Sequence, residues 1–198
     1  QSQSDLDIEL LLRRLLIASE RAVSIFEKDF EICFYNEELE AMVDREIDIV
    51  ESLNAIVADD DRDNDLFLQY QPIMDLRTGS IYAFEALSRL RTGKLGLVSP
   101  LEFIPIAEKT KLILPIGEKV IAKAFSFLNR LKGLGYDEIC ISINISVIQL
   151  LSPDFIERLF ELMSRMQVNS RNICIEITES VFASDYDSIN RIIGKLKN

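Results

Sequence analysis

The sequence contains no histidine, and its three cysteines, Cys33, Cys140 and Cys174, lie far apart along the chain. Because they are odd in number and lack the close spacing of a zinc site, we expect them to be small, reduced core residues of a cytoplasmic protein. Without histidine, any metal chemistry must rely on oxygen ligands. Mg²⁺ or Mn²⁺ is the natural cation for such ligands.

Long apolar runs and an excess of positive charge are also missing. No apolar run approaches the roughly 18 residues that a membrane-spanning helix requires. The polar, acidic stretch from Gln1 to Asp7 does not have the layout of a signal peptide. The chain carries 33 acidic against 22 basic residues, which gives a net charge of −11. This balance argues against a general DNA- or RNA-binding surface, so an anionic ligand would need a local cation to bind.

Three segments alternate between two kinds of side chain, as β-strands do. They are Ile81–Arg89, Ile139–Ser146 and Ile173–Thr178. In the second and third segments isoleucines occupy one face, and the other face carries mostly polar side chains. Helical patterns separate the three segments, which predicts βα units with a parallel sheet. We therefore expect an α/β fold, a partial TIM-like barrel with too few strands to close.

Glu85, Asn144 and Glu176 occupy matching positions on these three strands, which we predict to be near the C-terminal ends on the polar face. In a barrel this face lines the lumen, and active sites are built at the C-terminal mouth. We predict that the three side chains converge on one divalent cation. Taken singly, Glu85 could be an ordinary surface carboxylate and Asn144 could satisfy backbone groups at a strand end.

The remaining segments are predicted to be mostly helical. A helix over Leu6–Phe26 and a short strand over Phe30–Tyr35 come first, and Asn36 is expected to cap a helix that reaches Val57. A strand at Leu66–Ile73 should turn at Thr78-Gly79 into the Ile81 strand. A loop is predicted over 92–100, and helices over 101–109, 117–132, 153–166 and 186–197.

Two features have alternative interpretations. The stretch Asp59–Asp65 spaces its carboxylates like a calcium-binding loop, but Asn64 and Tyr70 replace the glycine and the final glutamate of such a loop. We therefore interpret it as a solvated linker. The apolar stripe of the preceding helix could form a dimeric coiled coil, but Glu46 interrupts it, which favours packing onto its own domain. We expect that stripe to consist of Leu39, Val43, Ile47, Val50, Leu53 and Val57.

Several short motifs occur together in a fixed order. They are Gln71-Pro72-Ile73, Glu85-Ala86-Leu87 followed by Arg89, the stretch Pro100–Glu108, Asn144-Ile145-Ser146, and Glu176-Ile177-Thr178-Glu179. In these motifs the chain from Leu66 onward resembles the first half of the EAL-type cyclic di-GMP phosphodiesterases. The resemblance implies a modified barrel whose first strand is antiparallel to the others, which agrees with the tight turn at Thr78-Gly79.

The resemblance also implies roles for individual residues. Glu85, Asn144 and Glu176 would be the ligands of Mg²⁺ or Mn²⁺, in agreement with the strand-face argument. Gln71 and Arg89 would contact cyclic di-GMP, Arg89 through a phosphate. Glu179 would brace a loop near the metal. As alternatives, Gln71 could be an ordinary strand-end residue and Arg89 could pair with a lumenal carboxylate.

The implied reaction is hydrolysis of cyclic di-GMP to linear di-GMP in bacterial second-messenger signalling. The family's paired aspartates, catalytic lysine and later glutamate have no counterpart before Asn198. The chain alone is therefore expected to be inactive, whereas its full-length parent could be active. The alternatives are a non-catalytic cyclic di-GMP receptor and a protein-interaction module. Because four strands leave an unpaired edge, we expect self-association through this part.

The N-terminal segment weakly resembles the end of a GGDEF-type domain, around Leu11-Leu12-Arg13 and Phe34. The motif that names that domain is not in this chain, so no cyclase activity is assigned. We expect residues 1–35 to be a remnant of such a domain, 36–65 a linker helix with an acidic loop, and 66–198 the N-terminal half of an EAL domain. By analogy, the linker would connect the domains for signalling.

Overall fold

The computed structural model describes residues 8, 11–16, 36–58, 65–177 and 186–196. The chain consists of two units, Gln1–Ile49 and Val50–Asn198. In the first unit, Arg13 lies on a helical segment and its Nη2 donates to Asp44 Oδ1 at 2.5 Å. Both side chains of this ion pair are about half exposed, so the pair contributes little to stability. The predicted strand over 30–35 lies outside the described residues.

Helix α2 (Glu37–Ala58) begins where the sequence predicts. Asn36 Oδ1 accepts a hydrogen bond from the backbone N–H of Leu39 at 2.7 Å, which satisfies one of the free donors of the first turn. The fully buried side chains of α2 are Ile49, Leu53 and Ile56. The predicted apolar stripe is therefore partly wrong, since Ile47 is 48% exposed and Ile56 takes part instead. The observed spacing of four and three residues follows one helical face more closely.

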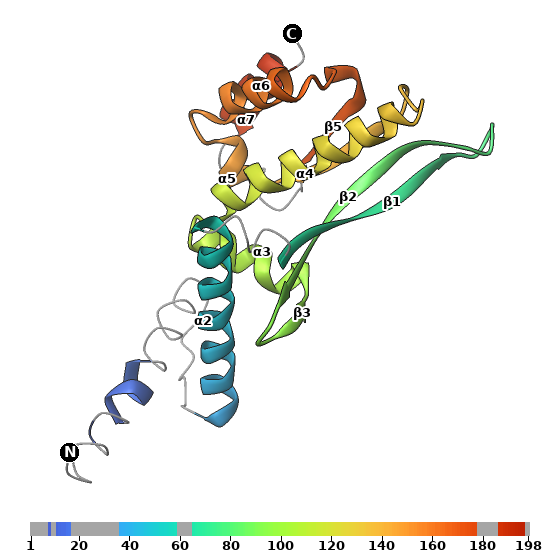
Figure 1. The fold of residues 1–198 in the computed structure, drawn as a ribbon. Coiled ribbons are helices and arrows are strands. Elements are labelled where there is room, and N and C mark those ends of the chain that lie inside the picture. Colours follow the sequence, from blue (N-terminus) through green and yellow to red (C-terminus); the bar gives the residue numbers. More distant parts are fainter. Residues whose placement is uncertain (1–7, 9–10, 17–35, 59–64, 178–185, 197–198) are drawn as a thin grey trace. The chain divides into compact units, whose positions relative to one another are not determined.

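A five-stranded mixed sheet forms the centre of the second unit (Figure 1). Its strands are β1 (Leu66–Asp75), β2 (Ser80–Thr92), β3 (Gly96–Val98), β4 (Cys140–Ile145) and β5 (Ile173–Ile177). They lie in the order β1-β2-β4-β5, with β3 also paired to β2. β1 and β2 are antiparallel, whereas β2, β4 and β5 are parallel. This confirms the α/β class, the antiparallel first strand and a sheet that does not close.

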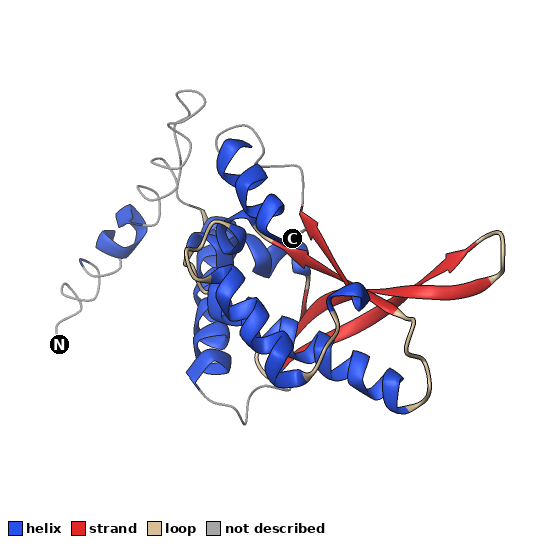
Figure 2. Cartoon of the chain, turned by 90° about the horizontal axis from the view of Figure 1, so that it is seen from above, coloured by secondary structure: helices blue, strands red, loops and turns tan. Residues whose placement is uncertain are grey.

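The β1–β2 hairpin turns where the sequence predicts and extends beyond the other strands (Figure 2). Gly79 adopts φ +70°, a conformation that side chains disfavour, and its N–H donates to the Asp75 carbonyl at 2.8 Å. The hydroxyls of Thr78 and Ser80 are 2.6 Å apart across the turn. These local bonds fix the register of the hairpin.

The loop predicted over 92–100 contains an additional strand, β3, so that prediction is wrong in part. β2 continues to Thr92, and β3 turns back to pair with it, with Leu90 opposite Val98. Thr92 Oγ1 accepts the N–H of Leu95 at 2.8 Å, and Gly96 takes φ +68°. Two features explain why the sequence pattern does not predict β3. The tight turn before it needs only a glycine and a hydroxyl, and a strand of three residues is too short to show an alternating pattern.

Helices follow strands β3, β4 and β5 along the chain. They are α3 (Pro100–Lys109), α4 (Ile113–Gly133), α5 (Val147–Leu150), α6 (Phe155–Met166) and α7 (Tyr186–Leu196), with a 3₁₀ turn at Ser170–Asn172. α4 packs against both β1 and β4. Ile141, Ile143 and Phe125 are at most 1% exposed, which places the core between α4 and β4. Sequence patterns predict all but α5, and α4 begins four residues earlier than expected.

Tyr70 on β1 lies against α4. Its ring stacks on Phe127 with centroids 3.6 Å apart, and its hydroxyl donates to the Lys123 carbonyl at 3.3 Å. Burial raises the pKa of Tyr70 from 10.0 to about 12, and the nearby Arg130 opposes this to a smaller extent. The neutral phenol is therefore the form that the fold favours.

This tyrosine predicts a loss of stability at alkaline pH. Because the folded pKa is raised, the stabilisation is complete below pH 10.0 and is lost as the pH rises toward about 12. Urea unfolding of the wild type should show a steeper fall in the free energy of unfolding across this range than Tyr70→Phe shows. If the free energy of unfolding fell equally with pH in the two proteins, the Tyr70 hydroxyl would not contribute to the loss of stability.

Candidate functional site

The polar face of the sheet brings Glu85, Asn144 and Glu176 together from three adjacent strands. Asn144 Nδ2 donates a hydrogen bond to Glu85 Oε1 at 2.9 Å. Asn144 and Glu176 are register partners on β4 and β5, so their side chains leave the same face of the sheet side by side. The three residues thus form one cluster, as the strand pattern predicts. Their role as metal ligands stays a prediction.

One part of that prediction is wrong, because Glu85 does not lie near the end of its strand. β2 continues to Thr92, since antiparallel pairing with β1 and β3 extends its second half. Glu85 is opposite Ser142, whereas Asn144 is opposite Glu176. The cluster is therefore staggered by one side-chain step, and the hydrogen bond from Asn144 to Glu85 spans that step.

Each carboxylate of the cluster accepts a hydrogen bond from β4. Glu85 accepts from Asn144, and Glu176 Oε1 accepts from the hydroxyl of Ser142. Ser142 is 3% exposed, and both carboxylates are half-buried. Sequence reasoning does not assign this role to Ser142, although its position two residues before Asn144 places it on the same face. The serine orients the Glu176 carboxylate within the cluster.

The two predicted substrate residues lie on the same face beside the cluster. Gln71 on β1 is directly opposite Glu85 and is exposed. Arg89 is further along β2, where its Nε donates to Gln69 Oε1 at 2.8 Å and its Nη1 donates to the Ser88 carbonyl at 2.8 Å. A neutral amide and a carbonyl thus hold the guanidinium, and its positive charge is not neutralised by these contacts. Sequence reasoning missed Gln69, which precedes Gln71 by one period of the strand.

Other predictions concern residues outside this cluster. Glu179 lies outside the described residues, as does Cys33. The expectation that the cysteines are core residues is wrong for Cys174, which is exposed on the polar face of β5. Cys140 lies on the same face of β4, is half-buried, and its Sγ is 3.3 Å from the Arg171 carbonyl. Burial raises the pKa of the Cys140 thiol, with smaller contributions from Cys174 and Glu138.

The donor atoms of the cluster fit a hard divalent cation. Two carboxylates and one amide oxygen are ligand types that Mg²⁺ and Mn²⁺ accept. Because Asn144 Nδ2 points to Glu85, its Oδ1 is the atom that can bind a cation. In the part of the chain that the structure describes, no three His, Cys, Asp or Glu residues are grouped closely enough to hold a metal. A cation held by this cluster would therefore take its third protein donor from the Asn144 amide.

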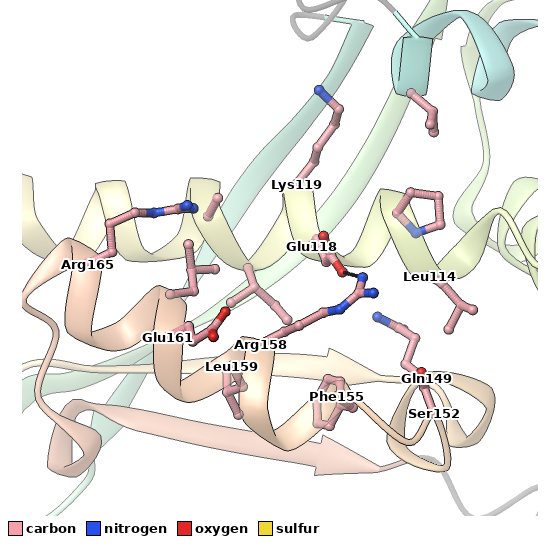
Figure 3. A pocket seen from close by; sticks show the side chains of 15 residues that line it. Leu114, Glu118, Lys119, Gln149, Ser152, Phe155, Arg158, Leu159, Glu161 and Arg165 are labelled. Carbon is pink, nitrogen blue, oxygen red and sulfur yellow. Dashed lines mark hydrogen bonds and ion pairs between the residues drawn. The ribbon is translucent and has the colours of Figure 1, made fainter.

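A pocket of about 490 Å³ lies elsewhere, between α4 and α6 (Figure 3). The ion pair between Glu118 and Arg158, 2.5 Å long, crosses it, and both side chains are half exposed. Phe155 and Leu159 supply apolar lining. None of the predicted site residues lines this pocket, so we place the candidate site on the opposite, polar face of the sheet.

Comparison with known proteins identifies the family of this chain. Residues 53–198 match the family model of the EAL domain. PdeI of Escherichia coli (strain K12), named a probable cyclic di-GMP phosphodiesterase, is 38% identical over 59% of this chain and 15% of its own length. The cyclic di-GMP phosphodiesterase PA2567 of Pseudomonas aeruginosa is 30% identical over 80% of this chain and 26% of its own. The chain thus spans about a quarter or less of these relatives.

A solved structure of a phosphodiesterase is also similar to this chain. The PaMucR phosphodiesterase in complex with c-di-GMP aligns with a TM-score of 0.69 and 27% identity, covering 76% of this chain and 59% of that one.

Among the helices that the structure describes, none is long and apolar enough to cross a membrane.

Proposed function

This chain belongs to the EAL domain family, and we propose from this that it is the part of a cyclic di-GMP phosphodiesterase that holds a divalent cation beside the dinucleotide. The observation that carries the proposal is the cluster of Glu85, Asn144 and Glu176 on one face of the sheet. Relatives named as cyclic di-GMP phosphodiesterases share the domain, and a structural relative binds c-di-GMP.

Each residue of the site has a defined task in this proposal. Glu85, Glu176 and the Oδ1 of Asn144 would hold Mg²⁺ or Mn²⁺, and Ser142 would keep the Glu176 carboxylate oriented. A bound cation would supply Lewis acidity toward a phosphoryl oxygen and lower the pKa of a coordinated water. Arg89 would offer its guanidinium to a phosphate, because Gln69 holds it without neutralising its charge. Gln71 would donate to the dinucleotide from the strand next to Glu85, and Glu179 would brace a loop near the cation.

The wider context is also part of the proposal. Two carboxylates and one amide can hold a single cation, whereas hydrolysis at a two-metal site requires further ligands. We therefore expect the 198-residue chain to bind but not hydrolyse cyclic di-GMP, and the larger protein to perform the reaction in the cytoplasm. Residues 1–35 would be the end of a GGDEF-type domain, 36–65 a linker, and 66–198 half of an EAL domain that self-associates through its open sheet edge.

Calorimetric titration with cyclic di-GMP in the presence of Mg²⁺ tests this proposal. Arg89→Ala should weaken binding roughly tenfold or more, because a hydrogen bond to a charged group contributes about 1.5–3 kcal/mol. Arg77→Ala is the matched control, since it removes the same charge from the hairpin turn. Chromatography should detect no linear dinucleotide from the chain alone. The proposal fails if the wild type does not bind, or if both variants bind equally well.

A further inference from the structure

Gln149 is a buried polar side chain that fixes the turn after β4. It is 4% exposed. Its Oε1 accepts a hydrogen bond from the N–H of Ser146 at 3.1 Å, and the Oγ of Ser146 accepts one from the N–H of Gln149 at 3.3 Å. These reciprocal bonds form a capping box at the start of α5. The point at which the chain leaves β4 is therefore held by a side chain as well as by the sheet.

Asn144 lies where the pairing of β4 with its two neighbouring strands ends unevenly. On the β2 side the last register pair is Ala86 with Ile143, so the parallel ladder stops one residue before Asn144. On the β5 side pairing continues to Ile145. The Asn144 amide nevertheless points toward β2, where it donates a hydrogen bond to Glu85. Beyond Ile145, the capping box is the next constraint on this backbone, and it limits rotation of the strand end.

Gly117 on α4 provides the space that Gln149 occupies. A Cβ placed on Gly117 would lie 2.7 Å from Cδ of Gln149 and still closer to its Nε2. The backbone of Gly117 lies inside α4 and does not have the positive φ that would itself require glycine. Glycine is less favourable than alanine within a helix, so the neighbouring side chain is the physical reason for it. Figure 3 shows Gln149 reaching from α5 toward α4.

We propose that Gly117 and Gln149 are a positioning pair for Asn144, and through it for the cation and the dinucleotide phosphate. The part that concerns the cation rests on the function proposed above. Neither residue belongs to the cluster of Glu85, Asn144 and Glu176. α4 leaves room for the amide of Gln149, this amide locks the strand-to-helix turn, and the turn directs Asn144 toward Glu85. The pair thus links the helical layer to the open polar face of the sheet.

A double-mutant cycle tests the pairing itself. Gly117→Ala should lower the thermal midpoint when Gln149 is present, because the added methyl displaces the amide. In a Gln149→Ala background the same change should leave the midpoint unchanged or raise it, since only the helix propensity of alanine remains. Gly133→Ala is the control, because its Cβ would meet no atom within 4 Å. Equal effects of Gly117→Ala in both backgrounds would overturn the proposal.

The side-chain amide resonance of Asn144 tests the positioning, and it requires no cation. Gly117→Ala, Gln149→Ala and Gln149→Met should all shift this resonance relative to the wild type and to Gly133→Ala. Methionine fills the volume of Gln149 without its acceptor, so its effect separates the hydrogen bond from packing. An unchanged Asn144 resonance in folded Gln149→Met would refute the role of the capping box.

Mn²⁺ affinity completes the test. Loss of a group that orients a metal ligand typically weakens metal binding by about 10- to 100-fold, so we expect at least about tenfold weaker Mn²⁺ binding by the Gln149 variants. Unchanged affinity alongside normal wild-type binding would overturn the positioning pair and leave the proposed function intact. If the wild type itself does not bind Mn²⁺, the cation part of the proposed function fails, and the amide resonance and the cycle alone decide the pairing.

Discussion

Replacing Glu176 with glutamine should lower the Mn²⁺ affinity of this chain by about 100-fold or more, because direct ligands contribute more than the outer residues whose loss costs about 10- to 100-fold. The substitution removes one of two negative charges in the cluster and one of its strongest oxygen donors. An amide oxygen can still accept the hydrogen bond from Ser142, so the local structure should be preserved. The change therefore separates ligation from folding.

The same variant should be at least as stable as the wild type when no metal is present. Glu85 and Glu176 both approach Asn144 on the same face, so removing one charge relieves repulsion between like charges. Mn²⁺ titration followed by electron paramagnetic resonance would measure the affinity, and thermal unfolding in a chelator would measure the stability. Glu161→Gln on α6 is the matched control, since it makes the same charge change in the pocket between α4 and α6, which none of the three cluster residues lines. Equal losses of affinity in both variants would mean that the net charge of −11, and not ligation, attracts the cation.

The cluster was largely predictable from the sequence because its chemistry follows the two-residue period of a strand. Alternation alone assigns Asn144 and Glu176 to the polar face and the isoleucines to the core. The structure has the first arrangement, and it buries the isoleucines of β4, whereas those of β5 are only half-buried. Alternation does not predict the register between strands that are distant in sequence. That register depends on how α3 and α4, which precede β4 in the chain, pack against the sheet, and it places Glu85 opposite Ser142.

Short elements and long-range contacts were not predictable for a related reason. β3 has three residues and α5 has four, which is about one period of either structure, so neither gives a repeating signal. The contact of Gly117 with Gln149 joins two helices, and a lone glycine in a helical pattern does not identify its neighbour. Arg89 shows the same limit, since the structure gives it a side-chain partner, the amide of Gln69 on the opposite strand, that the sequence pattern does not identify.

The core on the isoleucine face predicts the second large effect. Phe125 on α4 is 0% exposed, and α4 packs against both β1 and β4, the strand that carries Asn144. Phe125→Ala removes buried apolar surface and leaves a cavity that the surrounding helix and strands can fill only in part. Such a change typically costs about 3–5 kcal/mol. Since a domain is stable by only about 5–15 kcal/mol, a large part of the folded population should be lost.

Urea unfolding followed by circular dichroism would measure this cost. Phe160→Ala on α6 is the control, because the side chain is 43% exposed and little apolar surface is lost. Its free energy of unfolding should change by only about 0.5 kcal/mol. If Phe125→Ala lowered the free energy of unfolding no more than Phe160→Ala, the packing of α4 against the isoleucine face of β4 would not stabilise that strand. The support for Asn144 would then come from the capping box and β5 alone, and the Gln149 variants would lower Mn²⁺ affinity more than any core substitution on α4.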